Sequence, residues 1–310
     1  MSHQDTEVIA RIEAVFADAG ARGFLHAHEI GADDGPEVSA GADEPVVLAS
    51  VFKIVVAVAF ARAVEAGRLE ETETATVGPR YRIGGIGTAG CADDVRMSLR
   101  DLALFMLTMS DNAATDVIYH RLGPAAVDQV LTDLKLANTR IIGCCEDLFR
   151  TIAEDLGGDL NDLDATLAAT TEEQILRLAV LDPARTSAST PREIGALLDA
   201  IWTDRAATPA ACERVRNIMA HQIWPHRLSS GFTPDVTIAA KTGTLPAVRN
   251  ECGVVTFPDG RRYAVAVFTR AASLAERQPA VDAAIGHAAR IAVDHLRATV
   301  AAPSHHGVAR

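Results

Sequence analysis

The sequence has few cysteines, no long apolar run and no excess of basic charge, and each shortage excludes a class of protein. No stretch approaches the roughly 18 uninterrupted apolar residues that a membrane-spanning helix needs, so we expect no membrane partner. The net charge of −12, from 29 basic and 41 acidic residues, argues against a nucleic-acid partner. With 48% hydrophobic and 23% charged residues, the 310-residue chain is typical of a globular protein and not of a disordered, collagenous or coiled-coil one.

The five cysteines fit neither a disulfide framework nor a zinc site. Their number is odd, two are adjacent and no CxxC spacing occurs, which favours a reducing compartment. The histidines show no H-x-x-x-H pairing, and the glycine-rich segment 84–90 lacks the pattern of a phosphate-binding loop. We therefore expect no metal and no cofactor. Segment 1–18 has neither the basic nor the apolar region of a signal peptide, which predicts a cytoplasmic chain unless a signal was removed.

The hydrophobic spacing changes twice along the chain. It predicts short strands near the N-terminus, mainly helices from residue 50 to about 224, and a period close to two after residue 234. The expected elements at the two ends are helices 7–17 and 279–298 and strands 24–30, 46–49, 236–240, 252–257 and 263–269.

This order predicts an α/β fold of the α+β type. One mixed, antiparallel sheet is built from both chain ends and flanked by the terminal helices, and an all-helical lobe is inserted between its halves. We expect one domain over 1–49 plus 235–310 and a helical domain over 50–234. Because small-molecule sites favour clefts between lobes, the active site is expected between them.

The first motif with chemical content is Ser50-Val51-Phe52-Lys53, at the start of an apolar helix. Residues three apart share one face of a helix, so an ammonium would lie beside a hydroxyl, an arrangement that activates a serine. Taken alone, the pattern also fits a capping serine followed by an ordinary surface lysine.

Two further motifs follow along the chain. Ser110-Asp111-Asn112 lies between two predicted helices and serves either as a helix cap or as a polar cluster facing a cleft. Lys241-Thr242-Gly243-Thr244 ends a predicted strand, where the glycine would let a ligand approach the backbone and the lysine would supply a cation; an ordinary strand end is the alternative.

The three motifs together, in this order, form the S-x-x-K, S-D-N and K-T-G signature of class A β-lactamases and penicillin-binding proteins. The chain resembles the serine β-lactamase and penicillin-binding superfamily, and class A within it. The resemblance extends over nearly the whole chain, because segment 250–270, the final helix and Ser189-Thr190-Pro191 also look like family elements.

The resemblance implies a catalytic role for three of these residues. Ser50 would attack a carbonyl and become acylated, and Lys53 would take its proton directly or through water. Ser110 would pass a proton to the departing nitrogen. The backbone N–H groups of Ser50 and Leu245 are expected to form the oxyanion hole.

The resemblance also implies a binding role for the remaining motif residues. Asn112 would hold the amide side chain of the substrate, while Lys241 and Thr244 would hold its carboxylate. Thr242 and Gly243 would shape the strand edge, and Arg249 is a candidate second cation for an anionic substrate.

Hydrolysis of an acyl-enzyme requires a further residue, and there the resemblance is weaker. Class A enzymes carry a glutamate in an E-x-x-L-N loop, and counting from Ser110 at the family spacing reaches Glu146. Phe149 and Arg150 stand where that pattern has leucine and asparagine. Segment 151–184 is longer than in the family and acidic, and we expect a solvated excursion there.

The leading interpretation is therefore a class A-like serine hydrolase that opens β-lactam amides through an acyl-Ser50 intermediate. Two alternatives remain. One is an intracellular esterase or amidase on the same scaffold, because a fold does not determine the substrate. The other is a penicillin-binding protein that is acylated without efficient deacylation. In each case the partner is a small molecule; the sequence gives no indication of an oligomeric state.

Overall fold

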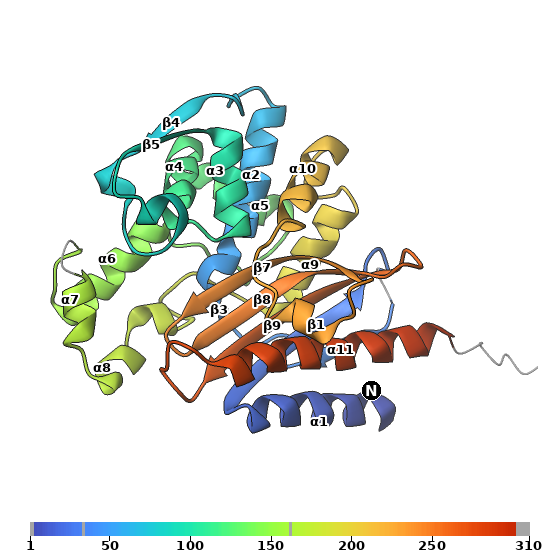
Figure 1. Ribbon diagram of the computed structural model, residues 1–310. Coiled ribbons are helices and arrows are strands. Elements are labelled where there is room, and N and C mark those ends of the chain that lie inside the picture. Colours follow the sequence, from blue (N-terminus) through green and yellow to red (C-terminus); the bar gives the residue numbers. More distant parts are fainter. Residues whose placement is uncertain (1–2, 33–34, 161–162, 302–310) are drawn as a thin grey trace, which may run out of the picture.

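A five-stranded antiparallel sheet joins the two ends of the chain in the computed structural model, which describes residues 3–32, 35–160 and 163–301 (Figure 1). The strand order is β2-β1-β9-β8-β7, so that an N-terminal strand pairs directly with a C-terminal one. The strands are β1 (Ala21–Glu29), β2 (Glu37–Ala40), β7 (Thr237–Leu245), β8 (Val248–Thr256) and β9 (Arg262–Ala271). The expected fold, with one sheet built from both chain ends, is confirmed.

The terminal helices α1 (His3–Asp18) and α11 (Pro279–Ala301) lie side by side along one face of this sheet (Figure 1). Each places apolar residues at helical spacing on its inner side, and the apolar core beneath the sheet includes Ile12, Phe16 and Ile285. Among the described helices, none is long and apolar enough to cross a membrane.

The inserted helices cover the other face of the sheet. The helix α2 (Lys53–Glu65) runs through their centre, and its residues from Ile54 to Ala61 are all buried, as the continuous apolar sequence requires. Around it lie α3 (Leu99–Thr108), α4 (Asn112–Leu122), α5 (Pro124–Asp133), α9 (Pro191–Trp202) and α10 (Pro209–Met219). The domain boundaries at residues 49–50 and 234–235 stay a prediction.

Several segments differ from the sequence-based expectation. The strand expected over 236–240 is β7, which continues to Leu245, so the K-T-G motif lies within the strand and not at its end. The strand expected over 46–49 is the two-residue β3 (Val46–Val47), which pairs with β6 (Ala188–Ser189) outside the main sheet. Segment 151–184 is not only a solvated excursion, because its apolar residues pack into a third small core. Its elements are the end of α6 (Cys145–Leu156), α7 (Leu163–Ala168) and α8 (Glu172–Leu176). Elsewhere in the inserted region, β4 (Thr74–Val77) and β5 (Val95–Ser98) form a separate two-stranded antiparallel sheet.

A glycine pair brings the segment that precedes β7 onto α11. A side-chain carbon built on Gly286 would collide with the carbonyl oxygen of Arg227, and one built on Gly231 would collide with the Gly286 carbonyl. The short 3-10 helix Leu228–Gly231 therefore lies directly on α11. This contact fixes the backbone that carries Arg227.

Replacing Gly286 by alanine tests this close approach. Helix propensity alone favours alanine by about 1 kcal/mol. We nevertheless expect Gly286→Ala to lower the free energy of unfolding by about 1–3 kcal/mol, because the added carbon overpacks the contact. Urea unfolding followed by circular dichroism measures this, with the exposed neighbour substitution His287→Ala as the control. An unchanged or raised stability in Gly286→Ala would contradict the packing.

Candidate active site

Ser50 lies in a short 3-10 turn, Ala49–Phe52, that leads directly into α2. Ala49 adopts a positive φ of 46°, a left-handed conformation that residues other than glycine rarely take. Strand β7 approaches this turn so closely that a side-chain carbon on Gly243 would lie 2.7 Å from the carbonyl oxygen of Leu48. The glycine of the K-T-G motif is therefore needed to bring the strand edge to the serine turn.

Lys53 joins the first motif to the second. Its side chain is fully buried, and Nζ donates to the backbone oxygen of Ser110 at 2.8 Å, to Oδ1 of Asn112 at 2.8 Å and to Oγ of Ser110 at 3.3 Å. These three acceptors use the donor capacity of an ammonium fully. The structure thus brings Lys53, Ser110 and Asn112 together, as the motifs predicted.

The S-D-N turn serves both as a helix cap and as part of this cluster. Asp111 caps α4 by accepting the N–H of Ala114 at 3.0 Å, and its other oxygen accepts from the backbone and side chain of Thr88. Ser110 has a φ of 67°, and Asn112 Nδ2 donates to the Gly84 carbonyl at 3.0 Å. The glycine-rich segment 84–90 is thereby held against the cluster.

The edge strand β7 brings a second buried ammonium to the site. Lys241 is fully buried and donates to the carbonyl of Thr242 at 2.8 Å. Its burial, together with the positive charges of Lys53 and Arg227, lowers the pKa of Lys241 well below the ordinary value. Without a bound anion these cations repel one another, and an anion bound among them would relieve that repulsion.

Arg227 is a site residue that the sequence analysis missed. Its Nη2 donates to Oγ1 of Thr244 at 2.9 Å, and its Nε donates to Oδ1 of Asp282 at 2.7 Å. Arg249, the cation expected from the sequence, follows Val248 in β8, but its guanidinium donates to the backbone carbonyl of Glu276. Arg249 lies opposite Thr244 in the register of β8 against β7, but within the described part of the chain the guanidinium of Arg227, and not that of Arg249, hydrogen-bonds to the Thr244 hydroxyl.

The backbone of Glu146 is tied to the site, whereas its side chain is not. The buried Asp116 carboxylate accepts the N–H of Cys145 at 2.7 Å and that of Glu146 at 2.9 Å, and so fixes the first turn of α6. The Glu146 carboxylate accepts from Arg150 at 2.5 Å. Within the described part of the chain, no hydrogen bond joins it to Ser50 or Lys53.

Leu245 ends β7, and its role in an oxyanion hole stays a prediction.

Asp116 lies close enough to Lys53 for the two charges to interact. Burial raises the pKa of Asp116 from 3.8 to about 6, although the two backbone N–H groups and the charge of Lys53 oppose the shift. A carboxylate that is costly to ionise therefore connects the Lys53 cluster to the start of α6.

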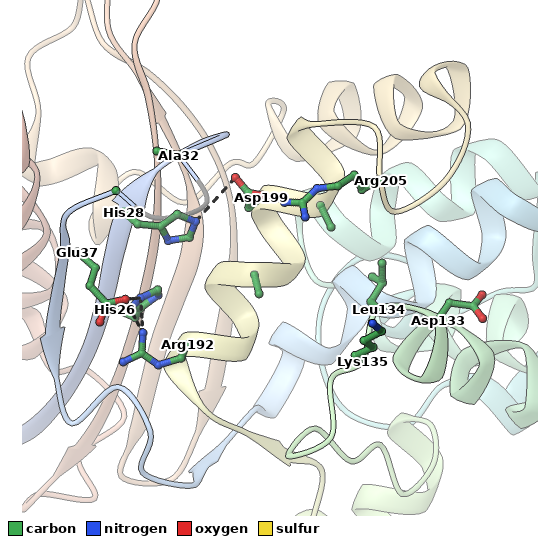
Figure 2. Close-up of a pocket in the computed structure, with 13 residues that line it drawn as sticks. His26, His28, Ala32, Glu37, Asp133, Leu134, Lys135, Arg192, Asp199 and Arg205 are labelled. Carbon is green, nitrogen blue, oxygen red and sulfur yellow. Dashed lines mark hydrogen bonds and ion pairs between the residues drawn. The ribbon is translucent and has the colours of Figure 1, made fainter.

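A separate cavity of about 500 Å³ lies between β1, the end of α5 and α9 (Figure 2). No predicted site residue lines it. Two of its charged side chains, Arg192 and Glu37, form an ion pair at 2.5 Å, and burial lowers the pKa of His26 to about 4. Asp199 accepts the N–H of Gly31 at 2.7 Å at this cavity.

Among the residues that the structure describes, no group of three or more His, Cys, Asp or Glu is arranged to hold a metal ion.

Asp116→Asn tests the cost of the buried carboxylate through the pH dependence of stability. An acid whose pKa is raised on folding is protonated more readily in the native state, so the wild type loses stability as the pH rises from about 4 to 6. The variant lacks this titration. We expect its free energy of unfolding, relative to wild type, to rise between pH 4 and 7 by up to about 3 kcal/mol.

Urea unfolding of both proteins at the two pH values measures this difference. Glu251, another buried acid, titrates in both proteins and does not contribute to it. A difference that stays constant with pH would contradict the buried, ionisable state of Asp116.

Comparison with known proteins agrees with this geometry. A family model described as the β-lactamase enzyme family matches residues 7–296. The β-lactamase regulatory protein BlaB of Streptomyces cacaoi is 31% identical over 280 residues, which cover 85% of this chain and 89% of that protein.

Solved structures share the fold. The β-lactamase of Sphaerobacter thermophilus superposes with a TM-score of 0.74 at 22% identity, and PBP-A with 0.72 at 23% identity; each match covers 94% of this chain and 97% of the other. The family match and the fold together show that this chain belongs to the β-lactamase enzyme family and is a serine hydrolase of the β-lactamase kind.

Proposed function

We propose that the chain opens β-lactam amides by attack of Ser50 Oγ on the carbonyl carbon and then hydrolyses the resulting ester. The observation that supports this most is the fully buried Lys53, whose ammonium is bound to Ser110 and Asn112 one helical turn beyond the serine. Attack forms the ester bond and breaks the carbonyl–nitrogen bond of the lactam. Lys53 takes the hydroxyl proton as a neutral amine; the ammonium so formed passes a proton to Ser110 as Ser110 delivers its own proton to the departing nitrogen, which regenerates the amine.

The charge at the strand edge supports a substrate that carries a carboxylate. Lys241 and Arg227 place two positive charges beside β7, and Thr244 provides a hydroxyl already bound to the guanidinium. Charge-assisted hydrogen bonds to a carboxylate are among the stronger polar contacts in proteins. A β-lactam carboxylate would relieve the repulsion between these cations on binding.

An intact-mass time course with benzylpenicillin tests the acylation step. We expect a covalent adduct on the wild-type chain and none on Ser50→Ala, because the variant lacks the nucleophile. Ser273→Ala, which alters an exposed serine before α11, should form the adduct as wild type does. Absence of both adduct and product with the wild type would overturn the proposal, and cleavage of p-nitrophenyl esters in that case would favour an esterase.

A second candidate, a penicillin-binding protein that keeps its acyl group, is favoured by one observation. The Glu146 carboxylate is paired with Arg150 and not with the Lys53 cluster. The relative from Streptomyces cacaoi is named as a regulatory protein, which fits a chain that recognises a β-lactam without rapid turnover. Both candidates share the acylation of Ser50 and differ only in the rate at which the acyl group is released.

Substitution of Glu146 separates the two candidates. If Glu146 is the base that activates the hydrolytic water, Glu146→Gln should slow release of penicilloate by about 100-fold or more. Arg150→Asn should accelerate release only about twofold, since a helical i,i+4 pair contributes a few tenths of a kcal/mol. Stopped-flow nitrocefin turnover and adduct decay by mass spectrometry measure both rates.

Arg177→Asn, which removes the comparable Glu173–Arg177 pair of α8, is the control and should change neither rate. An adduct whose lifetime is the same in wild type and in Glu146→Gln would instead establish the penicillin-binding candidate.

A further inference from the structure

Glu251 is a fully buried carboxylate close behind the edge of β7. It lies on β8 in register with Thr242 of the K-T-G motif. A charge removed from water in this way is costly unless it is paired and hydrogen-bonded. Both of its oxygens are engaged, because one accepts from Nε2 of Gln222 and the other accepts the backbone N–H of Leu228.

Gln222 connects this carboxylate to the strand itself. Its Oε1 accepts the N–H of Thr242 at 3.0 Å, while its Nε2 donates to Glu251. Since β7 is the outermost strand of the sheet, this side chain satisfies a backbone donor that would otherwise lie at an open edge. Segment 222–228 is therefore fastened to the sheet at both of its ends.

The fastened segment carries Arg227. The bond from Leu228 to Glu251 fixes the backbone one residue beyond the guanidinium, which then reaches Thr244 and also donates to the carbonyl of Asn250 at 2.8 Å. We propose that Glu251 and Gln222 are positioning residues that set Arg227 on Thr244 for recognition of the substrate carboxylate. This inference rests on the proposed function.

The charge of Glu251 contributes to the same arrangement. The charged groups that face it are Arg227, from the preceding segment, and Lys241, from β7. Burial raises the pKa of Glu251 to about 7, although its hydrogen bonds and both cations oppose the shift. Near neutral pH a proton on Glu251 weakens its hydrogen bonds with Gln222 and Leu228, on which the position of Arg227 depends.

The test compares acylation by benzylpenicillin with acylation by its methyl ester, which lacks the negative charge. We expect Glu251→Gln and Gln222→Ala to lower the second-order acylation rate for benzylpenicillin roughly tenfold or more, because a misplaced contact costs transition-state stabilisation. The rate for the methyl ester should change less than about twofold, since Arg227 has no carboxylate to hold. Glu251→Gln alters a buried charge and could prevent folding. Gln222→Ala keeps the Glu251 carboxylate and its hydrogen bond with Leu228, so it tests the same role in a chain that still folds.

Asp199→Asn is the matched control. Asp199 is also a buried carboxylate that accepts a backbone N–H, but it does so at the separate cavity of Figure 2. Its substitution should leave the ratio of the two acylation rates unchanged. A general loss of stability would lower both rates alike in every variant.

The pH profile gives a readout that a merely structural role would not change. In the wild type the acylation rate for benzylpenicillin should fall as the pH decreases through about 7, because Glu251 becomes protonated. In Glu251→Gln this step should disappear, whereas Lys241 titrates in both proteins.

The outcomes separate the two proposals. A wild-type chain that forms no adduct with either compound refutes the proposed function. A wild-type chain that is acylated, with variants that keep both the rate ratio and the pH step, refutes the positioning role of Glu251 and Gln222.

Discussion

The burial of the Lys53 ammonium is the constraint on which the rest of the site depends. Removing such a charge from water costs several kcal/mol, so the structure must supply polar partners in fixed positions. Two of these partners lie on Ser110 and one on Asn112. The central helix α2 is therefore joined to the turn before α4, and the side chains of Lys53, Ser110 and Asn112 are held together without a bound substrate.

The same constraint applies to the cations around β7. Lys241 and Arg227 lie close enough to oppose each other's charge, and Arg227 is stabilised by Asp282 and by backbone carbonyls. Glu251 lies behind both of them. Positive charges held together in a low dielectric bind an anion strongly. In this site the fold holds the cations in place before the substrate binds.

The features that the sequence predicted are the ones that local spacing determines. Ser50 and Ser110 lie where predicted helices begin or are joined, and Lys241 lies within β7, so the spacing of the motifs located all three residues without a structure. Arg227 and Glu251 were not, because their roles depend on tertiary packing and on the register of β8 against β7. Likewise, the two apolar residues of β3 predict a strand but do not specify its partner, which is β6 and not the main sheet.

Glu146 shows where spacing and geometry diverge. Its position in the chain came from a count, and its backbone is fixed by the hydrogen bonds that its own N–H and that of Cys145 donate to the buried Asp116. The direction of its side chain depends on a half-exposed pair with Arg150, which contributes only about 0.3–0.5 kcal/mol. The two constraints differ greatly in strength, so a substrate can turn the side chain far more easily than it can move the first turn of α6. On the proposal that Glu146 activates the hydrolytic water, release of the acyl group depends chiefly on where Asp116 holds that turn, and only slightly on Arg150.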